Sequence, residues 1–253
     1  MSDLESLEVT RVLIDGEVVA ENGQVTFELE PFEFPEWVTH SMHLGMDIAP
    51  ESFAVPVPDG APNTAAHIRT IEVIPGKVGT KETHIDPPVI DGKLESDIGQ
   101  DVLKTFVFER HHETGKFGYG FVKGFGIKRG AMASTVAHDA HNLLVVGTND
   151  DDMALAANTL IACGGGMVVV ADGEILGLVE LPIAGLMDAV PAEELSEKVH
   201  GMEKAWAEIG CTMPSPLMTM ALIPLACLAE LRLTNRGLVD CTTFQFATLL
   251  AAQ

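Results

Sequence analysis

The chain has 253 residues, enough for one substantial domain or for a domain with a fragment of another. Hydrophobic residues make up 47% and charged residues 21%, a balance that is typical of folded globular proteins and argues against extensive disorder. The net charge of −22, from 37 acidic and 15 basic residues, repels phosphate backbones and anionic lipids, so it argues against partners of the nucleic-acid and membrane-surface classes.

The first predicted element is a small β-meander in residues 1–29. Two alternating apolar runs flank Asp15-Gly16, a signal for a type I′ turn, and Asn22-Gly23 repeats that signal. A ribbon of two or three strands cannot bury a face by itself. We therefore expect the apolar face of residues 9–29 to need cover from another segment.

Residues 30–66 are predicted to form a Pro-rich, extended connection. Six prolines interrupt any helical or strand periodicity: Pro31, Pro35, Pro50, Pro56, Pro58 and Pro62. Four aromatic residues occur in the same stretch: Phe32, Phe34, Trp37 and Phe53. A free linker would not carry that many large apolar groups, so we expect these four to pack on the body of the protein.

Residues 67–253 mix strand and helix signals in one predicted domain. Strands are expected over residues 67–74 and 102–109, and residues 133–148 are expected to form two buried strands joined by a polar bend. A hairpin is expected in residues 166–181, with its turn at Asp172-Gly173, and Asp91-Gly92 marks a further turn. Because several strand pairs are linked by hairpins, the fold class is α/β (α+β). We predict a layered domain with a mixed, largely antiparallel sheet flanked by helices.

Three helices are predicted in this domain. The first begins at Asn149, is followed by three acidic residues that suit a helix N-terminus, and ends near Cys163 before a run of glycines. The second, within residues 191–210, has apolar residues at helical spacing: Leu195, Val199, Met202, Trp206 and Ile209. The third, more apolar, spans about residues 216–228 and is kinked or ended near Pro224.

The polar run AHDAHN lies between two apolar runs and is the first candidate site. His138 and His141 could ligate a metal or move protons, with Asp139 orienting an imidazole and Asn142 beside them. The alternative is a hydrogen-bonded bend that only fixes the sheet. The spacing of the residues leaves both interpretations open.

The second candidate, Arg110-His111-His112, follows an apolar strand, where an Arg beside two His could bind an anion, a carbonyl group or a partner surface. The alternative is a solvated turn at the strand end. A third candidate is Lys123 in the glycine-rich residues 118–130, which could cradle a phosphate. That stretch matches no known phosphate-loop pattern, so tight turns with basic residues placed against the acidic remainder are favoured.

The cysteines and the apolar stretches indicate a cytoplasmic protein. The four cysteines form no CxxC pair and no zinc-ligand spacing, so we expect reduced thiols. Residues 1–8 lack the basic and apolar regions of a signal peptide. The longest apolar stretch, around residues 217–228, is broken by Pro224 and is too short to span a bilayer.

Longer motifs resemble a known family. ERHH, GFVKGFG, RGA, AHDAHN and GTNDDDM, within residues 66–246, are similar to the C-terminal domain of bacterial and archaeal adenine deaminases of the amidohydrolase superfamily. VTRVLIDGEVVAENG resembles the last strands of the small β-sandwich beside an amidohydrolase barrel. The resemblance divides the chain into a sandwich remnant (1–29), a connection (30–66) and the C-terminal domain (67–253).

The resemblance implies hydrolytic deamination of adenine to hypoxanthine and ammonia by a metal-bound hydroxide, a step of purine salvage. In that family the metal ligands come from the barrel and begin with an HxH pair, and this chain contains no HxH. We therefore expect no metal bound by this chain and Mn or Fe in the full enzyme. The expected partners are the barrel domain or an equivalent chain, adenine in the complete enzyme, and further subunits of an oligomer.

Two functions from different classes follow. In the first, the chain is part of an adenine deaminase, and its AHDAHN and RHH clusters support the active site, the domain packing or an oligomer interface. In the second, it is a free-standing relative without deaminase activity. It would then serve as a binding or assembly module, or carry weak chemistry of its own at His138, Asp139 and His141.

Overall fold

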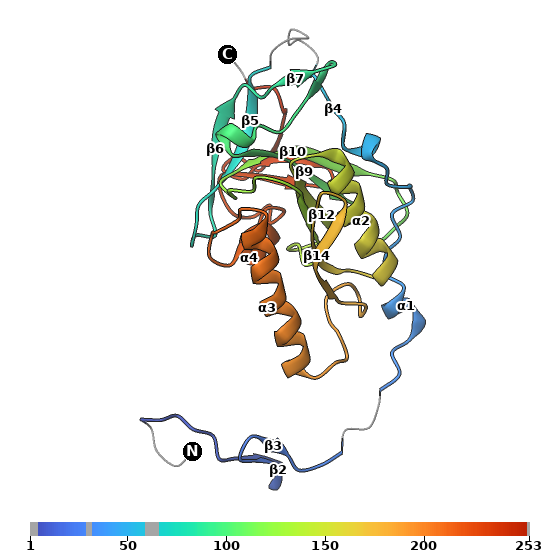
Figure 1. The fold of residues 1–253 in the computed structure, drawn as a ribbon, viewed down its shortest axis with the longest axis vertical. Helices are drawn as coiled ribbons and strands as arrows, with labels where there is room; N and C mark the ends of the chain where they lie inside the picture. Colours follow the sequence, from blue (N-terminus) through green and yellow to red (C-terminus); the bar gives the residue numbers. More distant parts are fainter. Residues whose placement is uncertain (1–4, 29–31, 59–65, 252–253) are drawn as a thin grey trace. The chain divides into compact units, whose positions relative to one another are not determined.

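The computed structural model describes residues 5–28, 32–58 and 66–251 (Figure 1). The chain divides into two compact units, residues 1–35 and residues 36–253. The sequence predicts boundaries after residues 29 and 66, whereas the described residues from 36 onward already belong to the larger unit. Two of the six prolines of the expected connection, Pro31 and Pro62, lie outside the described residues.

The smaller unit is the three-stranded antiparallel meander that the sequence predicts. Its strands are β1 (Arg11–Ile14), β2 (Glu17–Glu21) and β3 (Gln24–Val25). Asp15 and Gly16 both have positive φ, as do Asn22 and Gly23, which is the backbone that a type I′ turn requires. None of residues 5–28 is buried, so the apolar side chains of this unit are not covered.

The larger unit is built on one eight-stranded sheet. In order across the sheet, the strands are β14 (Glu174–Glu180), β13 (Gly166–Ala171), β11 (Ala131–Ser134), β12 (Leu143–Gly147), β9 (Val102–Phe108), β10 (Phe117–Lys123), β5 (Ile68–Val73) and β6 (Thr80–Ile85). Every neighbouring pair is antiparallel except β10 and β5, which run parallel. The predicted mixed, largely antiparallel sheet is confirmed.

Two layers cover opposite faces of this sheet (Figure 1). One layer contains α2 (Asp150–Cys163) and the 3-10 turn η1 (Pro50–Phe53); the other contains α3 (Ala192–Glu208), α4 (Pro216–Ala221) and a small sheet of β15 (Leu231–Thr234), β16 (Gly237–Asp240) and β17 (Gln245–Ala247). In β9, Phe106 and Phe108 enter the core beneath α2, whereas Leu103 and Val107 enter the opposite core. Because successive side chains alternate between faces, such a strand is stable only when both faces are packed.

The helices begin and end where their residues dictate. The side chain of Asn149 caps α2 by accepting the N–H of Asp152 at 2.8 Å, and Gly164 ends it in the left-handed region. In α3 the predicted apolar face is confirmed, with Met202 and Trp206 buried. The third helix is shorter than predicted: α4 ends at Ala221 and turns follow, since Pro224 cannot continue a helix.

The region expected as a connection packs only in part as predicted. It contains α1 (Glu36–Thr39), η1 and β4 (Val55–Pro56). Strand β4 pairs with β8 (Lys93–Leu94), which pairs with β7 (Val89–Ile90), in a small sheet. The 3-10 turn η2 (Ile98–Gln100) follows β8 in the chain. Phe53 is fully buried against Phe106 and Phe108, as expected. The prediction is wrong for Trp37 of the larger unit, which is 77% exposed; Phe32 and Phe34 belong to the smaller unit and are exposed there.

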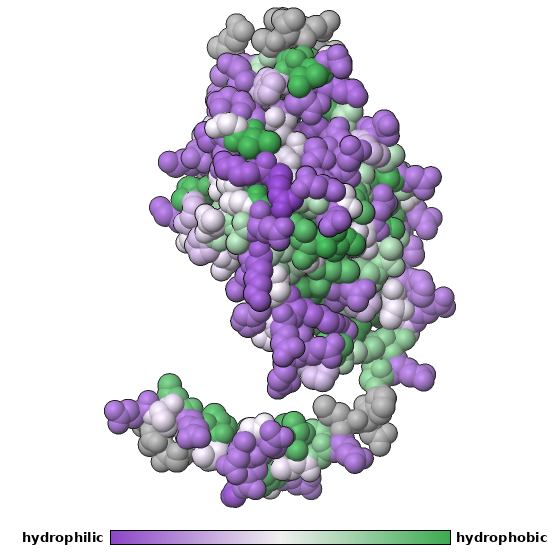
Figure 2. All heavy atoms as spheres, viewed as in Figure 1, coloured by the Kyte–Doolittle hydropathy of each residue, from purple (hydrophilic) through white to green (hydrophobic). Residues whose placement is uncertain are grey.

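Polar character dominates the surface. On the face shown in Figure 2, hydrophilic residues cover most of the larger unit, and hydrophobic residues gather between α2 and α3. Within the described residues, no helix combines the length and the apolar character that crossing a membrane requires.

Candidate functional site

The loop that joins β11 to β12 carries four of the predicted site residues. Because these strands pair antiparallel, the ends of the loop meet, and the N–H of His141 donates to the carbonyl oxygen of Ala137 at 2.7 Å. The N–H of His138 donates to the carbonyl oxygen of Ala221, where α4 ends, at 2.8 Å. The loop, defined here as residues 137–142, is therefore held from within and from the neighbouring layer.

Arg110 lies beside this loop because β9 pairs with β12. Its buried guanidinium donates from Nε to the carbonyl oxygen of His141 (2.5 Å), from Nη1 to the carbonyl and hydroxyl oxygens of Ser41 (2.8 and 3.0 Å), and from Nη2 to the carbonyl oxygen of Ala184 (2.8 Å). No carboxylate of the described residues pairs with it, and burial lowers the pKa of Arg110 to about 10. Its donors thus join three segments of the chain.

Glu109 organises the turn that follows β9. Its carboxylate accepts the N–H of His111 at 2.6 Å, the N–H of His112 at 3.1 Å and the hydroxyl of Thr114 at 2.9 Å. Burial by itself would raise the pKa of Glu109, but these hydrogen bonds together lower it. The charged form of Glu109 therefore stabilises the turn that presents both histidines.

The two histidines of this turn differ in their contacts. Nε2 of His111 lies 2.7 Å from the carbonyl oxygen of Ala140, so this nitrogen donates and fastens the turn to the loop. The side chain of His112 is exposed, and within the described ranges its ring contact is with His111, at 6.2 Å between centroids. Of these two histidines, His111 is the one that joins Arg110 in linking the turn to the loop.

His138 and His141 form the second pair of rings, edge to face with centroids 5.2 Å apart. Nδ1 of His141 accepts the N–H of Ala137 at 3.3 Å. Burial lowers the pKa of His141, and the neighbouring His138 and Arg110 lower it further. His141 is therefore held as a neutral imidazole near pH 7, with its remaining nitrogen protonated.

Lys123 is not part of this group. It ends β10, whereas Phe117, at the other end of that strand, pairs with Phe108 next to the Arg110 turn. Six residues of extended strand separate them by about 20 Å. In the glycine-rich stretch itself, Arg129 pairs with Asp172 and Glu208, which supports the interpretation of basic residues set against an acidic remainder.

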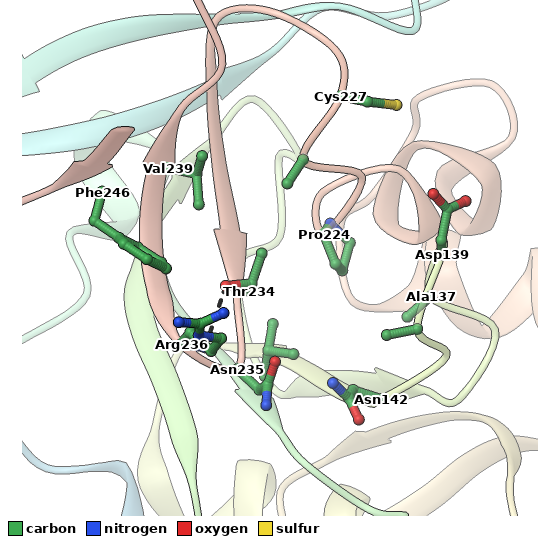
Figure 3. A pocket seen from close by; sticks show the side chains of 13 residues that line it. Ala137, Asp139, Asn142, Pro224, Cys227, Thr234, Asn235, Arg236, Val239 and Phe246 are labelled. Atoms are coloured by element: carbon green, nitrogen blue, oxygen red, sulfur yellow. Dashed lines mark hydrogen bonds between the residues drawn. The ribbon is translucent and has the colours of Figure 1, made fainter. Parts of the chain in front are cut away.

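A cavity of about 400 Å³ opens on one side of the loop (Figure 3). The loop contributes Asp139, which is exposed, and Asn142, which is 5% exposed. The C-terminal region contributes the opposite wall, which includes Asn235, Arg236 and Phe246. The guanidinium carbon of Arg236 lies over the ring of Phe246, 5.1 Å from its centroid, so the cation covers one face of the ring.

A second cavity, also of about 400 Å³, shares Ala140 of the loop with the first. Trp37, His43, His111 and His141 line it, with Arg110 at its base. The loop therefore contributes to two cavities, one with amide, carboxylate and guanidinium groups and one lined by histidines and an indole.

These residues do not fit a divalent metal ion. Within the described ranges, no group of three His, Cys, Asp or Glu side chains is placed to hold one. Near the loop, Nδ1 of His141 and Nε2 of His111 are already committed to backbone groups. The arrangement can bind, orient and exchange protons with a ligand, but its donor set is not that of a metal centre.

Sequence reasoning missed Asn235, Arg236 and Phe246. They reach the loop only because the β15–β16 hairpin packs on β10. Gly118 permits this approach, since a Cβ there would lie 2.0 Å from the carbonyl oxygen of Thr234. A glycine in a strand is the one signal of such close contact that the sequence offered.

Comparisons with known proteins show that the chain is similar to adenine deaminases. Residues 77–245 match the family model described as adenine deaminase C-terminal domain. Over its full 253 residues, the chain is 60% identical to an adenine deaminase of Clostridium botulinum (strain Langeland / NCTC 10281 / Type F), and it spans 42% of the length of that protein. An adenine deaminase of Moorella thermoacetica is 47% identical over 250 residues, and one of Roseobacter denitrificans is 41% identical over 250 residues; the chain spans 42% and 41% of their lengths.

Proposed function

The chain belongs to the family of the adenine deaminase C-terminal domain, and we propose from this membership that it is the carboxy-terminal part of an enzyme that hydrolyses adenine to hypoxanthine and ammonia. The observation that carries the proposal is the unbroken match of the whole chain, at 60% identity, to a protein named adenine deaminase. Because the chain spans about 42% of such relatives, the activity is that of a larger assembly.

The metal centre of that assembly belongs to the part of the relatives that this chain does not match. The described residues contain no suitable set of three ligands, and the chain has no HxH pair. A divalent ion, for which we propose Mn or Fe, would supply an activated water for attack on the purine. An amidohydrolase barrel, in the same polypeptide or in a second chain, is the partner that we propose to hold it.

Within this chain, we propose that the loop 137–142 supports the active site of the whole enzyme. Arg110 acts as a positioning residue through its bond to the carbonyl oxygen of His141. Held in this way, His138, Asp139, His141 and Asn142 present groups that can hold a ligand or move a proton. His111 belongs to the same surface, and for the exposed His112 and Lys123 we propose contacts at interfaces.

The cellular setting is part of the same proposal. Hydrolysis of adenine to hypoxanthine is a purine-salvage reaction, and reduced cysteines suit the cytoplasm, where we place the protein. We also propose that it acts as an oligomer, in keeping with the uncovered apolar side chains of the smaller unit.

The test is to assay the isolated chain and the reconstituted assembly side by side. Alone, the purified chain is expected to bind no stoichiometric Mn, Fe or Zn and to release no ammonia from adenine. Mixed with the amino-terminal part of the Clostridium botulinum relative, it is expected to form a complex that does both. Robust turnover by the isolated chain would overturn the proposal that the activity needs the metal-binding part of the assembly. A metal-loaded complex without turnover would favour the alternative that the chain is a binding or assembly module.

A further inference from the structure

We infer that the cavity between the loop 137–142 and the C-terminal hairpin is a binding site for a neutral purine base (Figure 3). The choice of a purine rests on the proposed function. The existence of the site and the neutrality of its ligand rest on the residues that line the cavity. Its volume of about 400 Å³ lies in the range of pockets that enclose small ligands.

The walls suit a flat aromatic ligand. The Arg236 guanidinium covers one face of the Phe246 ring, and Val107, Val239 and Pro224 contribute apolar walls to the cavity. Phe246 is 59% exposed although it lines an apolar hollow, so a face of its ring is free for stacking. Base–aromatic stacking is worth about 1–3 kcal/mol and any base can provide it.

The polar groups can read the edge of a heterocycle. Oδ1 of Asn142 accepts the N–H of Arg110 at 3.3 Å, which leaves Nδ2 as a donor. This nitrogen has no acceptor among the described residues, and Figure 3 shows it on the side of the cavity. Asp139 and the side chain of Asn235 likewise have no hydrogen bond within the described ranges, so the site offers a donor, an acceptor and an amide.

The charges select a neutral ligand. Asp139 and Arg236 are the charged residues among those that line the cavity, and their charges cancel. In a chain of net charge −22, a site without excess positive charge disfavours a phosphorylated ligand. Adenine and hypoxanthine, which are uncharged and carry donors and acceptors on one edge, fit this site better than a nucleotide.

The test is calorimetric titration of the full 253-residue chain with adenine, hypoxanthine and AMP. We expect saturable binding of the bases with one site per chain and weaker binding of AMP. Phe246→Leu should weaken base binding about tenfold, by loss of stacking. Phe244→Leu is the matched control, because Phe244 is similarly exposed (67% against 59%), lies two residues away and does not line the cavity. Asn142→Asp keeps the acceptor for Arg110 and removes the donor, so it should weaken adenine binding as well.

Saturable base binding that Phe246→Leu weakens and Phe244→Leu leaves unchanged would support the site. Absence of saturable base binding, equal effects of the two leucine variants, or tighter binding of AMP than of adenine would overturn it. The proposed function is judged separately by ammonia release from the reconstituted assembly. Turnover without base binding by this chain removes only the present inference, and base binding without turnover removes only the proposed function.

Discussion

Two buried arginines join segments that are far apart in the sequence. Arg110 binds the carbonyl oxygens of His141, Ser41 and Ala184, and Arg232 binds those of Leu228, Leu222 and Val78. Neither has a carboxylate partner among the described residues, and burial lowers the pKa of both guanidiniums. Each arginine thus donates to backbone carbonyl groups of separate, partly buried segments.

Replacement of Arg110 by lysine is expected to be strongly destabilising. A lysine ammonium is a point donor and cannot reach three segments at once, so buried carbonyl groups lose their partners. We predict that Arg110→Lys lowers the free energy of unfolding by about 3 kcal/mol or more in urea denaturation. Arg129→Lys, at an exposed ion pair, should cost less than about 1 kcal/mol. Equal effects of the two changes would contradict the structural role of Arg110.

Glu109 makes stability depend on pH. Its folded pKa lies below the ordinary value of 4.5, because the hydrogen bonds from its turn outweigh the effect of burial. A carboxyl with a lowered folded pKa contributes its stability above the unfolded value, and that contribution is lost as the pH falls through the folded value.

Glu109→Gln should therefore lower the free energy of unfolding by about 1–2 kcal/mol at pH 7, and the difference from the unsubstituted chain should shrink below about pH 4.5. Glu113→Gln, at an exposed position in the same turn, is the control and should change stability by less than about 0.5 kcal/mol. The measurement is urea denaturation from pH 7 to pH 3. A difference that stays constant over this range would count against the hydrogen-bonded carboxylate.

At the scale of elements, one glycine decides whether the C-terminal hairpin can reach the sheet. A Cβ at Gly118 would lie 2.0 Å from the carbonyl oxygen of Thr234 and 2.8 Å from the nitrogen of Gly237. Gly118→Ala should therefore push the β15–β16 hairpin away and lower stability by about 1–3 kcal/mol. Gly201→Ala, at an open position within α3, should instead stabilise by about 0.5–1 kcal/mol. Thermal unfolding checks the opposite signs, and a neutral Gly118→Ala would contradict the close packing.

Elements with strong local signals could be predicted from the sequence. The capped helix α2, the amphipathic helix α3, the hairpin turn at Asp172-Gly173 and the N-terminal meander all follow from turn, capping and periodicity rules. Strand β6 could not be predicted, because its sequence TKETHI is polar and an edge strand buries few side chains. Trp37 shows the same limit, since an aromatic residue gives no local sign of whether it packs.

The candidate site could be predicted only where the chain is continuous. AHDAHN was found because a polar run interrupts apolar strands. Its contact with Arg110 depends on the pairing of β9 with β12, and its place across a cavity from Arg236 and Phe246 depends on packing between layers. Such long-range placement leaves no periodic signal in a single sequence, so the wall of the cavity that the C-terminal region contributes could not be predicted.

At the scale of the whole molecule, the larger unit has a packed layered core, and the chain spans only part of the length of its relatives. Both faces of its eight-stranded sheet are packed, yet the smaller unit buries no described side chain and the described residues hold no metal ligand set. Relatives that are 60% identical are more than twice as long. We interpret the chain as the part that shapes and supports a site whose metal lies in another part.

The most direct measurement of that claim is a chimeric enzyme. The matching 42% of the Clostridium botulinum relative is replaced by this chain, and ammonia release from adenine is measured beside the parent and a truncated parent. We predict turnover within about tenfold of the parent, a difference of about 1.4 kcal/mol in the barrier, and none from the truncated protein. A folded, metal-loaded chimera that releases no ammonia from adenine would contradict the account.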